Sequence, residues 1–403
     1  MNSLWETPSC SEFLENIKKE IWSGNIILVF LPKHSPVNFL SELKMRLGKD
    51  GSISYEKINL QEVDQTEERP LESLFYAQFE LGNNVNTVIP KRVSEIFKHI
   101  PCNPTQVFVL ENLSISLLPK FIDFLTILGK YFTSIHDHLR HKFIVVIDPE
   151  VINPNLFKAE PGTSKHILKG LICPLNQALA LRFYFDFNVK KQNPLSENLV
   201  ISLAQFDYNL AEDLCGCDDF LEEYSSRLIK YASDRGWEAI RHKKEDDLNE
   251  DEVHQFWAKG IIDIRNEKLI YHSAFLKIHN KELELKKRIW HSGIQILLPL
   301  IEEFRSKLLS SKKIILPSKW INEKKDITIE DKNEFEISDI VYIMNKGQMK
   351  FPLLKISDKF KIMSFATLSW NIRNDLSHLK FPPIQEIKNF FREWDNVMRI
   401  LEC

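Results

Sequence analysis

Short apolar runs alternate with segments of helical apolar spacing over residues 1–190. Strands that a parallel sheet buries on both faces form continuous apolar runs, whereas half-exposed strands alternate apolar and polar positions. Runs of the first kind are 25–31 (NIILVFL), 105–113 (TQVFVLENL), 141–149 (HKFIVVIDP) and 180–189 (ALRFYFDFNV). Residues 35–47 and 117–132 have helical spacing, with Ser35 as the expected N-cap and Pro36 at the first helical position. We therefore predict an N-terminal α/β domain built on a parallel sheet.

Residues 191–278 form a second, smaller region with a different pattern. The part that begins NLAEDLCGCDD predicts two or three helices, with a charged break at 243–251. The stretch GIIDIRNEKLIYHSAFL, which begins at Gly260, predicts a strand, a turn and a second strand, with His272 as a packing residue. Helices followed by a hairpin resemble a winged-helix lid. The acidic character of the region favours a structural lid, and a DNA-binding regulator remains an alternative.

Residues 279–403 are predominantly helical in pattern. Apolar residues follow i, i+3 and i+4 spacing along 283–309, where Pro299 is expected to kink the helix. The charged stretch 318–336 lacks such spacing and predicts a loop. Two further helices are expected at 355–380 and 383–401. We therefore predict an all-α C-terminal bundle.

The stretch WNIRNDLSHLKFPP, at 370–383, combines an apolar stripe with a polar cluster. At about 100° per residue, the expected buried stripe consists of Phe365, Leu368, Ile372, Leu376 and Leu379. The polar wedge on the other side consists of Arg373, Asn374, Ser377 and His378, with Asp375 at its margin. Trp370 and Met363 project into the sector of this wedge. A large apolar side chain beside a polar cluster indicates a contact with a partner or with RNA.

RNDLSH near the end of a helical bundle resembles the R-N-x3-H signature of the HEPN superfamily, over about residues 280–403. Many HEPN domains are metal-independent endoribonucleases that build one active site from two facing copies of this motif. The resemblance implies catalytic roles for Arg373, Asn374 and His378, with Ser377 and Asp375 as supporting candidates. It also implies an RNA substrate, a homodimer through the C-terminal domain, and a role in bacterial defence or in a toxin–antitoxin system with a protein partner or antitoxin.

These residue types are suited to RNA cleavage on chemical grounds as well. The 2′-OH of RNA can attack the adjacent phosphate without a metal. Histidine is the side chain most often used for acid–base catalysis, which suits His378 to that role, and Arg373 supplies a permanent planar cation for phosphate oxygens. Asn374 precedes His378 by four residues, so it can orient the ring or the phosphate. We expect Trp370 and Met363 to contact the second copy or the RNA.

The order of strand, loop and helix at the N-terminus resembles P-loop ATPases of the AAA+/STAND type. A phosphate loop needs glycines, so that backbone N–H groups can surround phosphate, followed by Lys and Ser or Thr. The equivalent loop, LPKHSPVN, contains no Gly, although Lys33 and Ser35 are present, and Pro36 removes a donor. The acidic strand ends at Glu111 and Asn112, where an Asp–Glu pair is usual. We predict a degenerate ATPase scaffold with no cofactor and no ATP hydrolysis.

Composition narrows the remaining choices. The chain has 403 residues and a net charge of −3, which argues against a bulk nucleic-acid binder. The N-terminus lacks a signal peptide, and no apolar run approaches the length of a membrane span, so we expect a cytoplasmic protein. Among six Cys, Cys215 and Cys217 form the only close pair, with no matching Cys/His pair, so no metal site is expected. The main rival to a nuclease is a non-enzymatic pseudo-ATPase and helical adaptor in a multi-protein defence complex.

Overall fold

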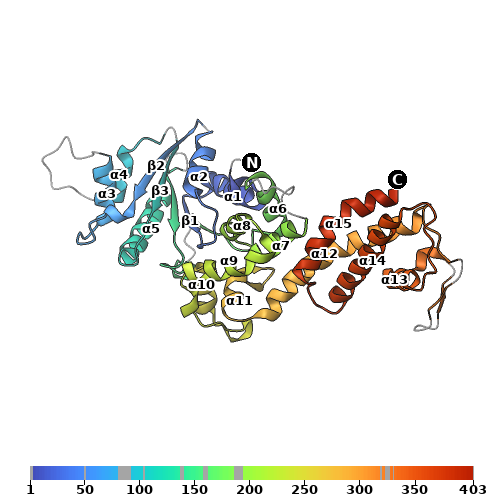
Figure 1. The fold of residues 1–403 in the computed structure, drawn as a ribbon. Coiled ribbons are helices and arrows are strands. Elements are labelled where there is room, and N and C mark those ends of the chain that lie inside the picture. The colour runs from blue at the N-terminus through green and yellow to red at the C-terminus, as the bar shows by residue number, and fades with distance from the viewer. Residues whose placement is uncertain are drawn as a thin grey trace. The chain divides into compact units, whose positions relative to one another are not determined.

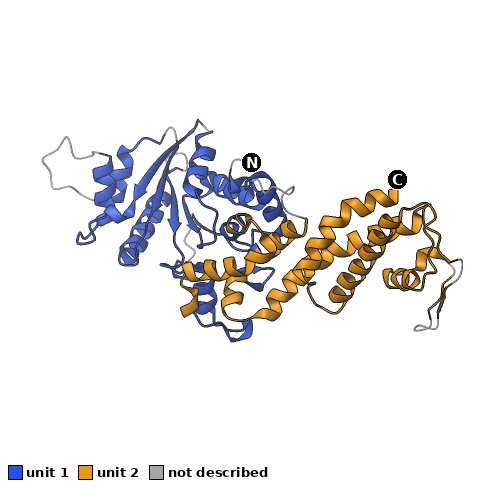
Figure 2. Ribbon diagram, viewed as in Figure 1, with its two compact units in different colours: residues 1–186, 204–212, 240–272 blue, residues 187–203, 213–239, 273–403 orange. Residues whose placement is uncertain are grey.

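The computed structural model describes residues 3–49, 51–79, 92–102, 105–136, 140–157, 162–185, 194–317, 320–322, 327–329 and 331–402. The chain forms two compact units that interleave along the sequence (Figure 2). Unit 1 comprises 1–186, 204–212 and 240–272, and unit 2 comprises 187–203, 213–239 and 273–403. The expected middle region thus contributes to both units, and the division at 1–190, 191–278 and 279–403 stays a prediction.

Unit 1 contains a five-stranded parallel sheet, which confirms the predicted α/β class (Figure 1). Its strands are β1 (Ile26–Phe30), β2 (Ile53–Asn59), β3 (Thr105–Glu111), β4 (Lys142–Ile147) and β5 (Thr163–Ile167). Their order in the sheet is β2-β3-β4-β1-β5. In this register Ile26 of β1 pairs with Phe143 of β4 on one side and with Thr163 of β5 on the other. The strand order reverses around β1, and the loops at the carboxyl ends of such strands commonly hold ligands.

Helices cover both faces of the sheet (Figure 1). They are α1 (Pro8–Ser23), α2 (Phe39–Gly48), α3 (Pro70–Gln78), α4 (Val93–His99), α5 (Leu118–Thr133) and α6 (Pro174–Phe183). Side chains alternate across each strand, so Val107 and Val109 pack into the core of α1 and α2. Phe108 and Phe143 point to the opposite face, where they contact Phe75 of α3 at ring distances of 5.3 and 5.8 Å. The central strands are therefore buried from both sides, which explains their continuous apolar runs.

Two of the strands were not predicted, and one predicted strand is wrong. β2 and β5 are the edge strands of the sheet, and most of their side chains are partly exposed. Edge strands lack the continuous apolar run by which the central strands are identified. The run 180–189 was predicted to be a strand, but 180–183 belongs to α6 and 186–189 lies outside the described residues.

The remaining part of unit 1 is a short helix with a hairpin. α10 (Glu250–Ala258) begins with a capping box between Asn249 and Glu252. β6 (Ile262–Arg265) and β7 (Lys268–Tyr271) pair antiparallel, as predicted. The connecting residues Asn266 and Glu267 both have positive φ, which is the conformation of a two-residue hairpin turn.

Unit 2 is mainly helical, as predicted. Its helices are α7 (Pro194–Ala204), α9 (Phe220–Asp234), α11 (Ser273–Ile278), α12 (Glu282–Ser310), α13 (Ile337–Asn345), α14 (Ile356–Ser377) and α15 (Ile384–Glu402). α8 (Tyr208–Cys215) crosses the boundary between the two units. α14 packs against α12, α13 and α15, and Pro299 lies inside the continuous α12. None of the helices in the described part of the chain is long and apolar enough to cross a membrane.

Two features of unit 2 depart from the expected pattern. The stretch 318–336, predicted to be a loop, contains a small antiparallel pair, β8 (Trp320–Asn322) and β9 (Ile327–Ile329). Trp320 and Ile329 are buried, and the Trp320 ring packs on Phe335 at 5.9 Å. The other departure is α13, a helix that the sequence pattern does not predict.

Candidate functional site

The C-terminal end of α14 carries the predicted polar cluster. The helix ends at Ser377, and His378 follows as its C-cap. Leu379 then takes the left-handed conformation at φ 57°, which is a common way for a chain to leave a helix. Pro382 and Pro383 prevent the helix from continuing. His378 is therefore presented at the open end of the helix.

The opposite side of α14 anchors it in the bundle. Its buried residues are Ile362, Phe365, Ala366, Ser369, Ile372 and Leu376. The Phe365 ring lies 4.9 Å from Phe304 of α12 and 4.9 Å from Phe390 of α15. At the helix end, the indole N–H of Trp290 donates to the carbonyl of Leu376 at 2.7 Å. These contacts fix which face of α14 is turned outward.

The helical-wheel prediction of the buried stripe is correct except at its C-terminal end. Phe365, Ile372 and Leu376 are buried, and Leu368 is half-buried. Leu379 was predicted to be buried, but it is 70% exposed. The reason is that Leu379 lies past the end of the helix at positive φ, so helical spacing no longer determines the direction of its side chain.

The polar residues of the cluster differ in their exposure and in the hydrogen bonds that they make within the helix. Asn374 and His378 are exposed. The hydroxyl of Ser377 donates to the backbone carbonyl of Arg373 at 2.8 Å, so its proton is already used within the helix. Ser377 can still accept a hydrogen bond through its oxygen. A supporting role for Ser377 is thereby limited to that of an acceptor in this conformation.

Arg373 forms an ion pair that the sequence pattern does not predict. Its guanidinium lies 3.7 Å from the carboxylate of Glu336, with side-chain exposures of 34% and 44%. Glu336 is the N-cap of α13, and it forms a capping box with Asp339. Only the packing of α13 on α14 brings Glu336 to Arg373. The sequence carries no standard capping signature at Glu336, because a capping box usually begins with Ser, Thr, Asp or Asn and has Glu or Gln three residues later.

Asp375 faces a different carboxylate. Burial, and then the charge of Asp375, raise the pKa of the Glu386 carboxyl on α15. One carboxylate oxygen of Glu386 is buried without a hydrogen-bond donor among the described residues. Asp375 thus acts on the α15 side of α14, and its supporting role in catalysis stays a prediction.

An apolar stripe leads along the outer face of α14 to the polar cluster. Ile356 is 75% exposed, Phe360 62% and Trp370 39%, and Met363 is half-buried. These positions and Asn374 follow one another at steps of three, four or seven residues, so they share one helix face. Exposed apolar residues aligned in this way are typical of a surface that contacts another molecule.

The loop after β1 is occupied by contacts within unit 1. The ammonium of Lys33 lies 2.9 Å from Asp148 and 3.6 Å from Glu150 at the end of β4, and its hydrogen bond to Asp148 raises the pKa of Lys33. The imidazole of His34 is 1% exposed and packs edge-on against Phe206 at 4.8 Å. The backbone N–H of Lys33 donates to Ala258. The side chains of Lys33 and His34 and the backbone N–H of Lys33 are therefore all engaged in contacts within unit 1.

The other positions expected in a nucleotide site are also engaged. Glu111 pairs with Lys57 at 2.6 Å, and the side-chain amide of Asn112 donates to Asn59 at 2.9 Å. α2 begins at Phe39 after a left-handed Asn38, so the predicted helix start at Ser35 and Pro36 is three to four residues early. The extra residues belong to the loop that carries Lys33 and His34.

Comparisons with known proteins identify distant structural neighbours only. No family model matches the chain, and no curated protein matches it. The Walker-type ATPase of Pyrococcus abyssi is 9% identical over 67% of this chain and 95% of its own, with a TM-score of 0.33. The Aeropyrum pernix ORC2 protein is 12% identical over 88% of this chain and 92% of its own, with a TM-score of 0.31. A structure of Drosophila ORC bound to DNA and Cdc6 is 11% identical over 99% of this chain and 70% of its own, with a TM-score of 0.34.

These neighbours are a Walker-type ATPase and ORC proteins by name. The structure itself shows a parallel sheet in an α/β arrangement in unit 1 and a helical C-terminal region. Over the described residues, no group of three or more His, Cys, Asp or Glu side chains is placed to hold a metal ion. Cys217 is buried and Cys215 half-buried, and neither forms a disulfide.

Proposed function

We propose that the protein is a metal-independent endoribonuclease of the HEPN type, with its reacting groups at the C-terminal end of α14. The observation that carries this proposal is the position of His378, Asn374 and Arg373 on the outward side of a helix end whose other side is anchored in the bundle. Within a protein of this kind, the ATPase-like unit or a partner would regulate cleavage, and the biological setting would be bacterial defence.

The reaction requires two proton transfers. One His378 accepts the proton of the RNA 2′-OH as its oxygen attacks phosphorus, and a second imidazole donates a proton to the departing 5′-oxygen. Arg373 stabilises the additional negative charge on the phosphorane oxygens. The products are a 2′,3′-cyclic phosphate and a 5′-hydroxyl, so neither water nor a metal takes part in the cleavage step.

The ion pair between Arg373 and Glu336 is compatible with this role. Both side chains are more than a third exposed, and such pairs contribute about 0–1 kcal/mol. RNA phosphate can therefore replace Glu336 at small cost. In the absence of RNA, Glu336 keeps the guanidinium directed to the side of α14 that faces α13.

A second copy of the chain would supply the second imidazole. The stripe of Ile356, Phe360, Met363 and Trp370 ends at Asn374, so a dimer that buried this stripe with the two copies of α14 parallel would bring two polar clusters together. One chain offers a single His on α14, whereas the reaction benefits from both a base and an acid. The dimer is thus part of the proposed mechanism.

The test is incubation of the purified full-length chain with mixed RNA, with and without EDTA. Cleavage should persist with EDTA and leave 2′,3′-cyclic phosphate ends. His378→Ala and Arg373→Ala should each abolish it. His291→Ala on α12 and Arg392→Ala on α15 are matched controls, since both residues are exposed and lie outside the cluster. Products with 5′-phosphates, sensitivity to EDTA, or full activity of His378→Ala would contradict the proposal.

The shared site has its own test. Truncation of an interface Trp commonly costs about 2 kcal/mol, or roughly thirtyfold in affinity. Trp370→Ala should therefore shift the protein toward monomer in analytical ultracentrifugation and lower cleavage in proportion. Mixing wild-type chains with an excess of His378→Ala chains should lower cleavage by more than dilution alone, because a mixed dimer holds only one of the two imidazoles that the reaction needs. Full activity of a monomeric wild type would refute the shared site.

A second candidate is a pseudo-ATPase adaptor without enzymatic activity. The observation that favours it is the β1 loop, in which Lys33 pairs with Asp148 and Glu150 and His34 is buried. We expect no ATP hydrolysis, because the loop offers too few free N–H donors to phosphate. An ATPase turnover that disappears in Lys33→Ala would refute this expectation. Complex assembly that survives both α14 substitutions, in a protein without nuclease activity, would favour the adaptor.

A further inference from the structure

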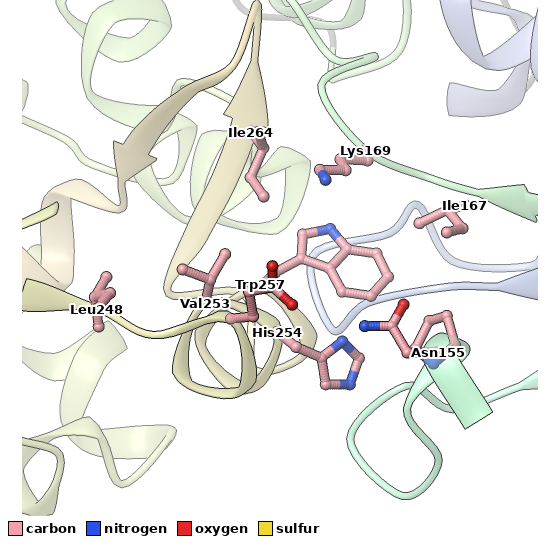
Figure 3. Close-up of a pocket in the computed structure, with 10 residues that line it drawn as sticks. Asn155, Ile167, Lys169, Leu248, Val253, His254, Trp257 and Ile264 are labelled. Atoms are coloured by element: carbon pink, nitrogen blue, oxygen red, sulfur yellow. The ribbon is translucent and has the colours of Figure 1, made fainter. Parts of the chain in front are cut away.

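Unit 1 contains a pocket of about 460 Å³ that the proposed nuclease does not use (Figure 3). It is lined by Pro154, Asn155, Ile167, Lys169, Leu248, Glu250, Val253, His254, Trp257 and Ile264. One wall follows β4, a second is the end of β5, and the third is α10 with β6. This is the carboxyl end of the parallel sheet, where α/β proteins commonly bind ligands. The volume lies within the usual range for small-molecule sites.

The pocket combines apolar and polar walls. Ile167, Val253 and Ile264 line it together with the face of the Trp257 indole (Figure 3). Trp257 is only 3% exposed, whereas Lys169 and Glu250 are exposed. The two charged residues therefore belong to the rim together with Ile167, which is also exposed, and the Trp257 ring, Val253 and Ile264 lie deeper. A ligand for this site needs an apolar body of modest size.

The indole N–H of Trp257 is a candidate donor to a bound ligand. This nitrogen is buried and has no hydrogen-bond acceptor in the described part of the chain. Buried donors in folded proteins nearly always have a partner, protein or water. Figure 3 shows the nitrogen edge of the indole directed toward the side of the pocket that carries Lys169. An oxygen placed there would accept from the indole N–H and from the Lys169 ammonium.

The remaining polar groups define the rest of the ligand. The ring nitrogen Nε2 of His254 lies 2.8 Å from the carbonyl of Pro149, so it is the donor of that bond. In the neutral ring, Nδ1 is then an acceptor. The carboxylate of Glu250 is a second acceptor at the rim, and the Asn155 amide can both donate and accept. The pocket thus offers a cation and donors for an anionic group, and an anion for a cationic group.

We propose that this pocket binds an apolar α-amino acid. Its carboxylate would accept from Lys169 and from Trp257 Nε1, its ammonium would donate to Glu250, and its side chain would lie against Val253 and Ile264. A simple fatty acid would leave Glu250 close to an unbalanced negative charge. A simple amine would leave the indole N–H without an acceptor.

Isothermal titration calorimetry of the full-length chain tests this assignment. The probes are leucine and phenylalanine, with leucinamide, which lacks the carboxylate, and N-acetylleucine, which lacks the ammonium. The two amino acids should bind, and each blocked form should bind at least about tenfold more weakly, since each loses a charge-assisted hydrogen bond. If leucine and phenylalanine do not bind, or if a blocked form binds equally well, the assignment is overturned.

Variants then locate the binding site. Lys169→Ala should weaken leucine about tenfold, and Trp257→Phe, which keeps an aromatic ring but removes the N–H, about fivefold. Lys19→Ala, an exposed lysine on α1 outside the pocket, is the matched control and should bind as the wild type does. Because Lys169 is exposed, its substitution is expected to leave the fold intact, which circular dichroism checks. Unchanged affinity in a folded Lys169→Ala protein would place binding elsewhere and refute the proposal.

Discussion

Two leucines at the end of α14 provide a direct test of how this part of the bundle is built. The helical wheel predicts that Leu376 and Leu379 are both buried, whereas the structure buries only Leu376, at 0% exposure, and leaves Leu379 70% exposed. Leu376 also lies against α12, where a Cβ on Gly293 would approach its side chain to 3.0 Å. The pair offers the same substitution, Leu→Ala, at two positions three residues apart.

The expected costs differ several-fold. Truncating a buried Leu removes its transfer free energy and leaves a cavity, which together cost about 2–5 kcal/mol. The close approach of Gly293 leaves little room for a neighbouring side chain to fill that cavity, so we expect about 3 kcal/mol for Leu376→Ala. An exposed substitution changes stability by about 0.5 kcal/mol at most, which is the expectation for Leu379→Ala.

Urea denaturation followed by tryptophan fluorescence measures this difference. Trp290 donates to the carbonyl of Leu376 and Trp394 lies 6.1 Å from Phe365, so both indoles report on unit 2. With an m-value of about 2 kcal/mol/M, a loss of 3 kcal/mol lowers the midpoint of the unit 2 transition by about 1.5 M. Leu379→Ala should leave the midpoint and RNA cleavage unchanged. Equal shifts for the two variants would refute the described end of α14.

Two further predictions concern unit 1. Burial lowers the pKa of His141 from 6.5 to about 4. As the pH falls, the unfolded chain therefore binds a proton at this residue before the folded chain does. The free energy of unfolding decreases by about 3 kcal/mol in total between about pH 6.5 and pH 4. His141→Gln should reduce that slope in denaturation midpoints measured against pH, and an unchanged slope would contradict the assignment. Gly170→Ala should destabilise unit 1 by more than about 2 kcal/mol, because Gly170 has φ 65° and an added Cβ would lie 2.3 Å from the Ile264 carbonyl. Gly236→Ala is its control, with similar φ and open space, and equal thermal shifts would count against the steric argument.

The central strands illustrate what a sequence determines by itself. β1, β3 and β4 lie between other strands and between two helical layers, so their central positions are apolar and the run can be recognised in the sequence alone. The same reasoning fails for β2 and β5, because an edge strand is stabilised by pairing with one neighbour and needs no continuous apolar run. Long helices such as α12, α14 and α15 were identified for a related reason, since a single buried face repeats over many turns.

The boundaries of elements depended on contacts that no local pattern contains. α2 begins at Phe39, later than the sequence predicts. The residues before it include Lys33 and His34, which contact the residues after β4 and distant segments of unit 1. β8 and β9 form in a charged stretch because Trp320 and Ile329 find a small core. Local propensity cannot anticipate such ordering, since the stabilising partners come from elsewhere in the chain.

The candidate sites divide in the same way. The sequence by itself singled out Arg373, Asn374 and His378, because Asn374 and His378 are four residues apart and therefore neighbours on one helix, with Arg373 next to Asn374. Only the tertiary structure decided that Glu336 reaches Arg373, since α13 and α14 are separate helices that meet through packing. The pocket at Trp257 could not be predicted from the sequence for the same physical reason. Its three walls come from segments around 155, 168 and 255, which come close together only when the chain has folded.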